Sequence, residues 1–139
     1  MCRFCLLLVA ISFFCSPGAG QHRPAPVSEV FGKYEFIDNL ITIRPADSGR
    51  LEISFTGICP NSRRRQGGVS PNTGSFSEVV PFQDGVATVR LSFSGGDCII
   101  RIKPVGNSLL VTQKGDSSAC GFGFNVSAAG RYTRIRRRK

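Results

Sequence analysis

The sequence predicts an all-β protein, built as an antiparallel meander of about eight or nine short strands. Apolar and polar residues alternate with period two along most of the chain, and clusters of turn-forming residues separate these stretches at short intervals. No stretch of any length shows the spacing of an amphipathic helix. A small barrel is favoured over a sandwich, because closing the sheet removes exposed strand edges.

The clearest strand is residues 50–58 (RLEISFTGI), where Leu51, Ile53 and Phe55 face one side and polar residues the other. Pro81 belongs at a strand end or a sheet edge, because proline cannot donate a hydrogen bond to a ladder. Turns rich in Gly, Pro, Asn and Asp separate the strands. The expected strands are residues 31–37, 40–44, 50–58, 76–82, 86–93, 98–103, 109–114, 120–127 and 131–135.

The stretch CGFGFNVS, residues 120–127, is read as a strand with aromatic residues on one side and bare backbone at Gly121 and Gly123 on the other. Glycines in a strand permit a bulge or a sharp bend, so the structural interpretation is a tightly coiled barrel wall. The functional alternative is an opening for a ligand. Phenylalanines are expected to fill the barrel interior: Phe31, Phe36, Phe55, Phe82, Phe93, Phe122 and Phe124.

The chain divides into four parts. Residues 1–20 have a basic start, an apolar run and then small residues, which predicts a secretory signal cut after Gly20. The apolar run is too short to span a bilayer. The mature protein is therefore expected to be secreted or periplasmic. Residues 21–28 form a flexible lead-in, residues 29–135 a single β domain and residues 136–139 a basic tail.

Three cysteines follow the predicted signal, so an oxidising compartment predicts one disulfide and one leftover thiol. A hairpin of residues 98–103 and 109–114 would bring Cys98 close to Cys120. Cys59 would then be the leftover thiol, and three nearby arginines could raise its reactivity or its tendency to form dimers. A buried spare cysteine is the alternative, and pairing of Cys59 with Cys98 or Cys120 stays open.

Positive charge dominates the chain, whose formal net charge is +9, and two clusters carry much of it. One is the long connection after Cys59, and the other is the C-terminus. Clustered guanidinium groups match the geometry of phosphate, sulfate and carboxylate groups. The predicted partner is an anionic glycan, a lipid head group or an acidic protein surface. The candidate binding residues are Arg63, Arg64, Arg65, Arg134, Arg136, Arg137, Arg138 and Lys139.

Several functions are disfavoured. The one histidine, His22, lies in the expected lead-in, and most acidic residues fall in turns, so no catalytic residues are assigned. The sequence shows no metal-ligand spacing and no phosphate-binding glycine loop, so no metal or cofactor is predicted. Nucleic acid is a poor partner, because the basic residues form no recognised motif and the signal directs export. An oligomeric state is not indicated.

Residues 97–102 (DCIIRI), 110–113 (LVTQ) and 120–126 (CGFGFNV), followed by Gly130-Arg131-Tyr132, resemble a group of small exported bacterial β-rich proteins that are largely uncharacterised. The match covers roughly a third of the chain after the predicted signal. The resemblance implies an exported bacterial β module with a Cys98–Cys120 bridge, and it carries no catalytic residues.

The function expected from the sequence is a non-catalytic binding module that presents a basic loop and tail to an anionic partner. An inhibitor of a secreted hydrolase such as a lysozyme is the alternative, by analogy with small envelope β-barrels that insert a loop into a catalytic cleft. A cationic antimicrobial or effector protein is a weaker one.

Overall fold

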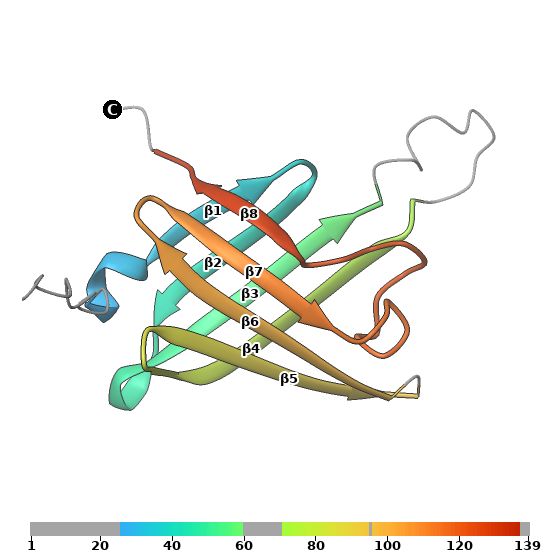
Figure 1. Cartoon of the computed structure of the whole chain (residues 1–139), viewed down its shortest axis with the longest axis horizontal. Helices are drawn as coiled ribbons and strands as arrows, with labels where there is room; N and C mark the ends of the chain where they lie inside the picture. Colours follow the sequence, from blue (N-terminus) through green and yellow to red (C-terminus); the bar gives the residue numbers. More distant parts are fainter. Residues whose placement is uncertain (1–25, 60–70, 95, 137–139) are drawn as a thin grey trace, which may run out of the picture.

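The computed structural model describes residues 26–59, 71–94 and 96–136. Eight strands form a closed barrel in which each strand pairs antiparallel with its neighbours in sequence, and β8 returns to pair with β1 (Figure 1). This confirms the all-β meander and its closure as a barrel. The strands are β1 (Gly32–Phe36), β2 (Asn39–Pro45), β3 (Arg50–Ile58), β4 (Thr73–Gln83), β5 (Val86–Phe93), β6 (Gly96–Val105), β7 (Ser108–Lys114) and β8 (Gly130–Arg134).

Alternation along the strands places every second side chain inside the barrel. In β3, Leu51, Ile53 and Phe55 are buried, and the polar residues between them face outward. Burial of this apolar surface is the main driving force that holds the barrel together. The largest fully buried side chains are Tyr34, Tyr132, Phe55, Ile41, Ile43, Leu51, Ile53, Ile100, Ile102, Leu109, Val30 and Val89.

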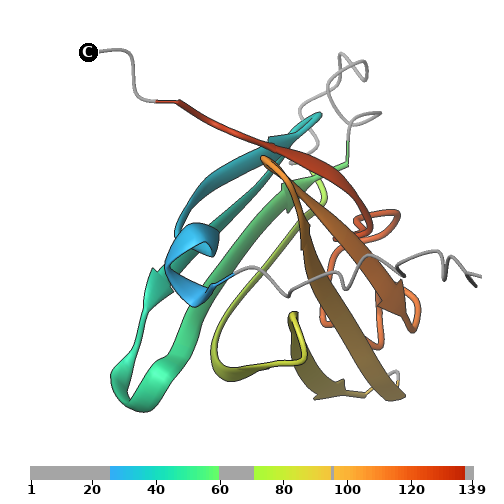
Figure 2. The same cartoon turned by 60° about the vertical axis from the view of Figure 1, so that its left-hand side comes forward.

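Different segments lie at the two ends of the barrel (Figures 1 and 2). At one end, here called the η1 end, lie the 3-10 helix η1 (Val27–Val30), the short η2 (Asp47–Gly49) and the end of β8. Val30 of η1 is buried, and the Tyr34 hydroxyl donates to its carbonyl at 2.9 Å. At the opposite end, here called the disulfide end, lies loop 115–129.

The expectation of a strand at residues 120–127 is wrong, because this stretch is a series of turns within loop 115–129. Gly121 and Asn125 have φ values of 70° and 61°, which break an extended strand. The amide of Phe122 donates to the carbonyl of Ser117 at 2.7 Å, so the loop folds back on itself rather than joining the ladder. The barrel therefore has eight strands, the lower of the two expected numbers.

Gly121 and Gly123 lack side chains, which lets this loop pack closely against the ends of β4 and β5. A Cβ on Gly121 would lie 2.8 Å from the ring of Phe93, at the end of β5. The amide of Gly123 donates to the Thr73 carbonyl of β4 at 2.8 Å, and a Cβ there would lie 2.9 Å from the same oxygen. The loop thus bridges β4 and β5, which pair directly over only two residues near the η1 end.

The phenylalanines divide into three groups. Phe55 and Phe122 are buried as expected, with ring centroids 5.2 Å apart, and Phe31, Phe36 and Phe82 pack partly buried against the core. The expectation that Phe93 and Phe124 fill the interior is wrong, since they are 55% and 73% exposed. Phe124 lies in a turn, where strand alternation does not apply, and Phe93 lies at the end of its strand against Gly121.

The Cys98–Cys120 disulfide joins β6 to loop 115–129 and confirms the pairing predicted from the hairpin. Its Cα atoms are 4.9 Å apart and it encloses a sequence separation of 22 residues. Cys59 lies outside this bridge and is buried at the end of β3, where its amide donates to the Asn72 carbonyl at 3.0 Å. The alternative pairings of Cys59 with Cys98 or Cys120 are excluded.

Tyr132 in β8 places a hydroxyl inside the barrel, where it donates to the Ala128 carbonyl at 2.9 Å. Burial raises the pKa of Tyr132 to about 12, although a hydrogen bond with Asn39 acts in the opposite direction. We expect Tyr132→Phe to cost about 1–2 kcal/mol at neutral pH, because the buried carbonyl loses its donor.

The raised pKa of Tyr132 predicts how the stability of the fold changes at alkaline pH. The phenol ionises near pH 10 when the chain is unfolded and near pH 12 when it is folded, so its contribution is complete below pH 10 and is lost as pH rises toward 12. Urea denaturation of wild type and Tyr132→Phe from neutral to alkaline pH should show their difference narrowing above pH 10. If the difference in free energy of unfolding between wild type and Tyr132→Phe stayed constant above pH 10, the assignment of a raised pKa to Tyr132 would be contradicted.

Candidate anion-binding surface

The predicted binding residues occupy separate parts of the chain. Arg63, Arg64 and Arg65 lie outside the described residues, as do Arg137, Arg138 and Lys139. Of the whole set, the structure describes only Arg134 and Arg136. The ends of β3 and β4 that flank the first cluster lie at the disulfide end, whereas Arg134 lies at the η1 end.

Arg134 is built into the fold. Its Nη2 atom donates to the Tyr34 hydroxyl at 2.6 Å and to the Glu29 carbonyl, and its guanidinium carbon lies 5.1 Å from the centroid of the Tyr34 ring. Its Nε atom is buried without a hydrogen-bond partner. These contacts tie β8 to β1 and η1, so the first role of Arg134 is structural.

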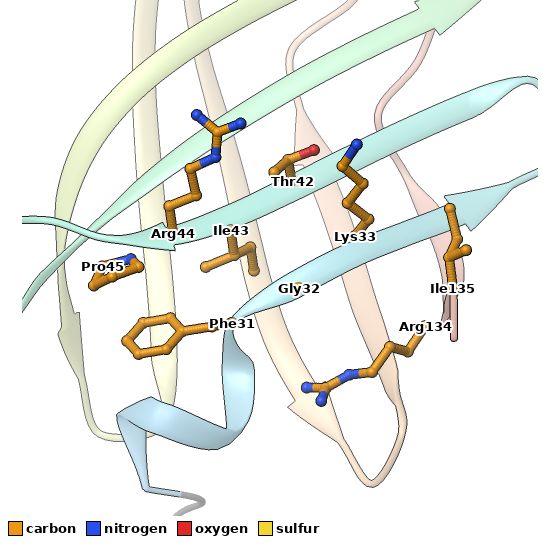
Figure 3. Close-up of a pocket in the computed structure, with 9 residues that line it drawn as sticks. All are labelled: Phe31, Gly32, Lys33, Thr42, Ile43, Arg44, Pro45, Arg134 and Ile135. Atoms are coloured by element: carbon orange, nitrogen blue, oxygen red, sulfur yellow. The ribbon is translucent and has the colours of Figure 1, made fainter. Parts of the chain in front are cut away.

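A recess of about 480 Å³ lies beside Arg134, where β1, β2 and β8 meet (Figure 3). Lys33, Thr42 and Arg44 project from one side of the β1–β2 pair, whereas the Arg134 side chain points toward η1. The three cations of the recess therefore do not converge on one point. Arg44 also faces Glu52 across the β2–β3 ladder. The recess is consequently a weaker candidate for anion binding than the surface described next.

A larger basic surface covers the outside of β5, β6, β7 and β8, and we call it the basic face. Its members occupy the outward positions of their strands, and all are exposed. The five cations of the basic face are Arg90, Arg101, Lys103, Lys114 and Arg131.

Strand pairing sets these cations into rows across the sheet. Leu110 of β7 lies between Lys103 of β6 and Arg131 of β8. In the next row Arg101 lies between two threonines, Thr88 and Thr112. In a third row Ile99 separates Arg90 from Lys114. Adjacent strands lie about 4.8 Å apart, so the four strands present a surface roughly 14 Å wide.

The basic face contains little negative charge. Within the described part of the chain, its one outward carboxylate is Asp97, which lies at the disulfide end and accepts a hydrogen bond from Ser92 at 3.2 Å. None of the five cations lies within 4.0 Å of a described carboxylate oxygen. The opposite wall, β1 to β4, mixes both signs, with Glu35 and Glu52 outward among its cations.

Asp116 lies in loop 115–129, outside the basic face. Its carboxylate accepts hydrogen bonds from the Ala119 amide and the Ser118 hydroxyl, both at 2.8 Å, and these bonds lower its pKa. This arrangement shapes a turn. Over residues 26–59, 71–94 and 96–136, no group of three or more His, Cys, Asp and Glu side chains could hold a metal ion. No helix in those ranges is long and apolar enough to cross a membrane.

Comparison with protein-family models, curated proteins and solved structures finds no match to this chain. The class is therefore defined by the fold and the surface alone. The described residues form a small, closed, antiparallel β-barrel with one disulfide and one basic wall.

Proposed function

We propose that this protein is an exported, non-catalytic binding module that holds an extended anionic partner against its basic face. The observation that carries the proposal is the set of five exposed cations on four adjacent strands, none of them paired with a described carboxylate. Arginine and lysine side chains so arranged can contact several anionic groups at once, and the threonine hydroxyls between them can add hydrogen bonds.

The two alternatives from the sequence depend on other residues. Inhibition of a hydrolase by an inserted basic loop requires Arg63, Arg64 and Arg65, which lie outside the described residues. An antimicrobial role requires the C-terminal tail, most of which also lies outside them. The basic face supports anion binding without either segment.

The test compares two variants of equal net charge. Arg101→Glu with Lys103→Glu reverses two charges of the basic face, and Arg44→Glu with Arg50→Glu reverses two on the opposite wall. We expect the first variant to bind dextran sulfate about 100-fold more weakly than wild type, at roughly tenfold for each cation that no longer binds a sulfate group. The second should bind only a few-fold more weakly, because it shares only the reduced long-range attraction.

Fluorescence titration at fixed salt measures both affinities. If the two variants lost affinity for dextran sulfate equally, net charge alone would drive binding, and the basic face would not be the binding site. A greater effect of the Arg44 and Arg50 variant would move the site to the recess of Figure 3.

A further inference from the structure

Ile37 occupies a position that neither the backbone nor the core explains. It is the first of two turn residues between β1 and β2, its φ is 55°, and Asp38 after it is not among the residues with positive φ. A turn of this pattern strongly prefers glycine at that first position, and a β-branched residue there is rare. The Ile37 side chain is also 72% exposed. The fold gains little buried surface in return for this strained backbone.

The position of Ile37 relates it to the basic face. Residues 34 and 35 of β1 pair with residues 134 and 133 of β8, and the Phe36 ring lies 5.6 Å from the Tyr132 ring. The last pair between β1 and β8 is Glu35 and Thr133, and Ile37 in the β1–β2 turn and Arg131 near the start of β8 both lie beyond it, toward the disulfide end. Ile37 therefore lies at the same end of the barrel as the start of β8, whose Arg131 forms a row with Leu110 and Lys103.

This row alternates apolar and cationic side chains across the barrel wall. Leu110 is 46% exposed, and Val105, 43% exposed, lies in the neighbouring row toward the η1 end. A soluble polyanion offers ionic contacts to the cations but no apolar surface to these side chains. The surface of an anionic bilayer offers both, because lipid phosphates lie beside the acyl chains.

We infer that the partner of the basic face is an anionic lipid bilayer, and that Ile37 inserts into it while Arg131 and Lys103 contact the head groups. This inference rests on the proposed function, and it assigns a role to Ile37 and Leu110, which anion binding alone leaves unused. Exposed apolar side chains between cations are typical of proteins that lie on a membrane surface.

The experiment measures binding to three probes: phosphatidylglycerol–phosphatidylcholine vesicles, phosphatidylcholine vesicles and dextran sulfate. Because the apolar run at residues 6–14 would itself bind vesicles, the protein is taken from the exported fraction of its host and its N-terminus is read by mass spectrometry. Wild type should bind the anionic vesicles and dextran sulfate, and should bind the phosphatidylcholine vesicles far more weakly.

The informative variant is Ile37→Gly. It should weaken binding to anionic vesicles about tenfold, leave binding to dextran sulfate unchanged and raise Tm by a few degrees, because glycine relieves the left-handed backbone. The matched control is Ser48→Gly in η2, where an exposed serine has a φ of 58°. It should raise Tm in the same way and leave vesicle binding unchanged.

The outcomes separate the inference from the function on which it rests. If wild type binds dextran sulfate but not anionic vesicles, the inference that the partner is a bilayer is overturned, and the anion-binding function stands. Binding to neither probe overturns both. If Ile37→Gly binds anionic vesicles as well as wild type does, insertion of Ile37 is overturned.

Discussion

Replacing Phe122 with alanine is expected to lower the free energy of unfolding by about 3–5 kcal/mol, the range typical of a buried phenylalanine. The Phe122 ring lies 5.2 Å from that of Phe55 and 6.4 Å from that of Phe76, measured between centroids. It also covers Gly74, where an added Cβ would lie 2.7 Å from the ring. Removing the ring leaves a cavity at the disulfide end. In the native barrel β4 and β5 do not pair with each other at this end, so no strand ladder compensates for the lost packing.

The control for this prediction lies two residues away. Phe124 belongs to the same loop and is 73% exposed, so Phe124→Ala should change the free energy of unfolding by less than about 0.5 kcal/mol. Urea denaturation followed by circular dichroism measures both variants. Equal effects of the two substitutions would show that Phe122 is not an anchor of the barrel core.

Removal of the Cys98–Cys120 bridge is expected to cost about 3 kcal/mol, through the chain entropy that the cross-link removes from the unfolded state. The double variant Cys98→Ala, Cys120→Ala should melt well below wild type under oxidising conditions. Wild type should fall to a similar Tm when a reductant is added, whereas the double variant should not respond to it. A wild-type Tm that is insensitive to reductant would contradict a stabilising bridge.

Phe122 and the bridge hold the same loop, so their effects should not be independent. Once the bridge is absent, loop 115–129 is less restrained and Phe122 contributes less to the folded state. The combined variant should therefore be destabilised by less than the sum of the two separate effects. A fully additive result would show that the two anchors act on separate parts of the barrel.

Most of the barrel could be predicted because each of its strands is short, alternates with period two and pairs with a neighbour in sequence. The prediction of a strand at residues 120–127 was wrong for a specific reason. Their aromatic alternation imitates a strand, but the left-handed backbone at Gly121 and Asn125 and the nearby bridge shape a loop instead. Side-chain pattern alone does not reveal such backbone angles when glycine and asparagine permit both.

The candidate surface was harder to predict than the fold. Contiguous arginines are visible in a sequence, whereas the basic face draws its five cations from four strands that span residues 86–134. Only the strand register brings Arg131, Leu110 and Lys103 into one row. The signal that was available is the outward half of each strand, where β5 to β8 carry five cations and one carboxylate.

Closure of the barrel by β8 has a consequence for how the chain reaches its native state. Neighbouring hairpins can form from local contacts. The pairing of β1 with β8, however, joins strands about 100 residues apart in sequence, as the Tyr34–Arg134 contact shows. Contacts of such sequence separation are slow to form, because a long loop must be closed before they contribute. A chain still emerging from the ribosome therefore cannot yet close the sheet. The cylinder becomes complete only when its last strand is free to join the first.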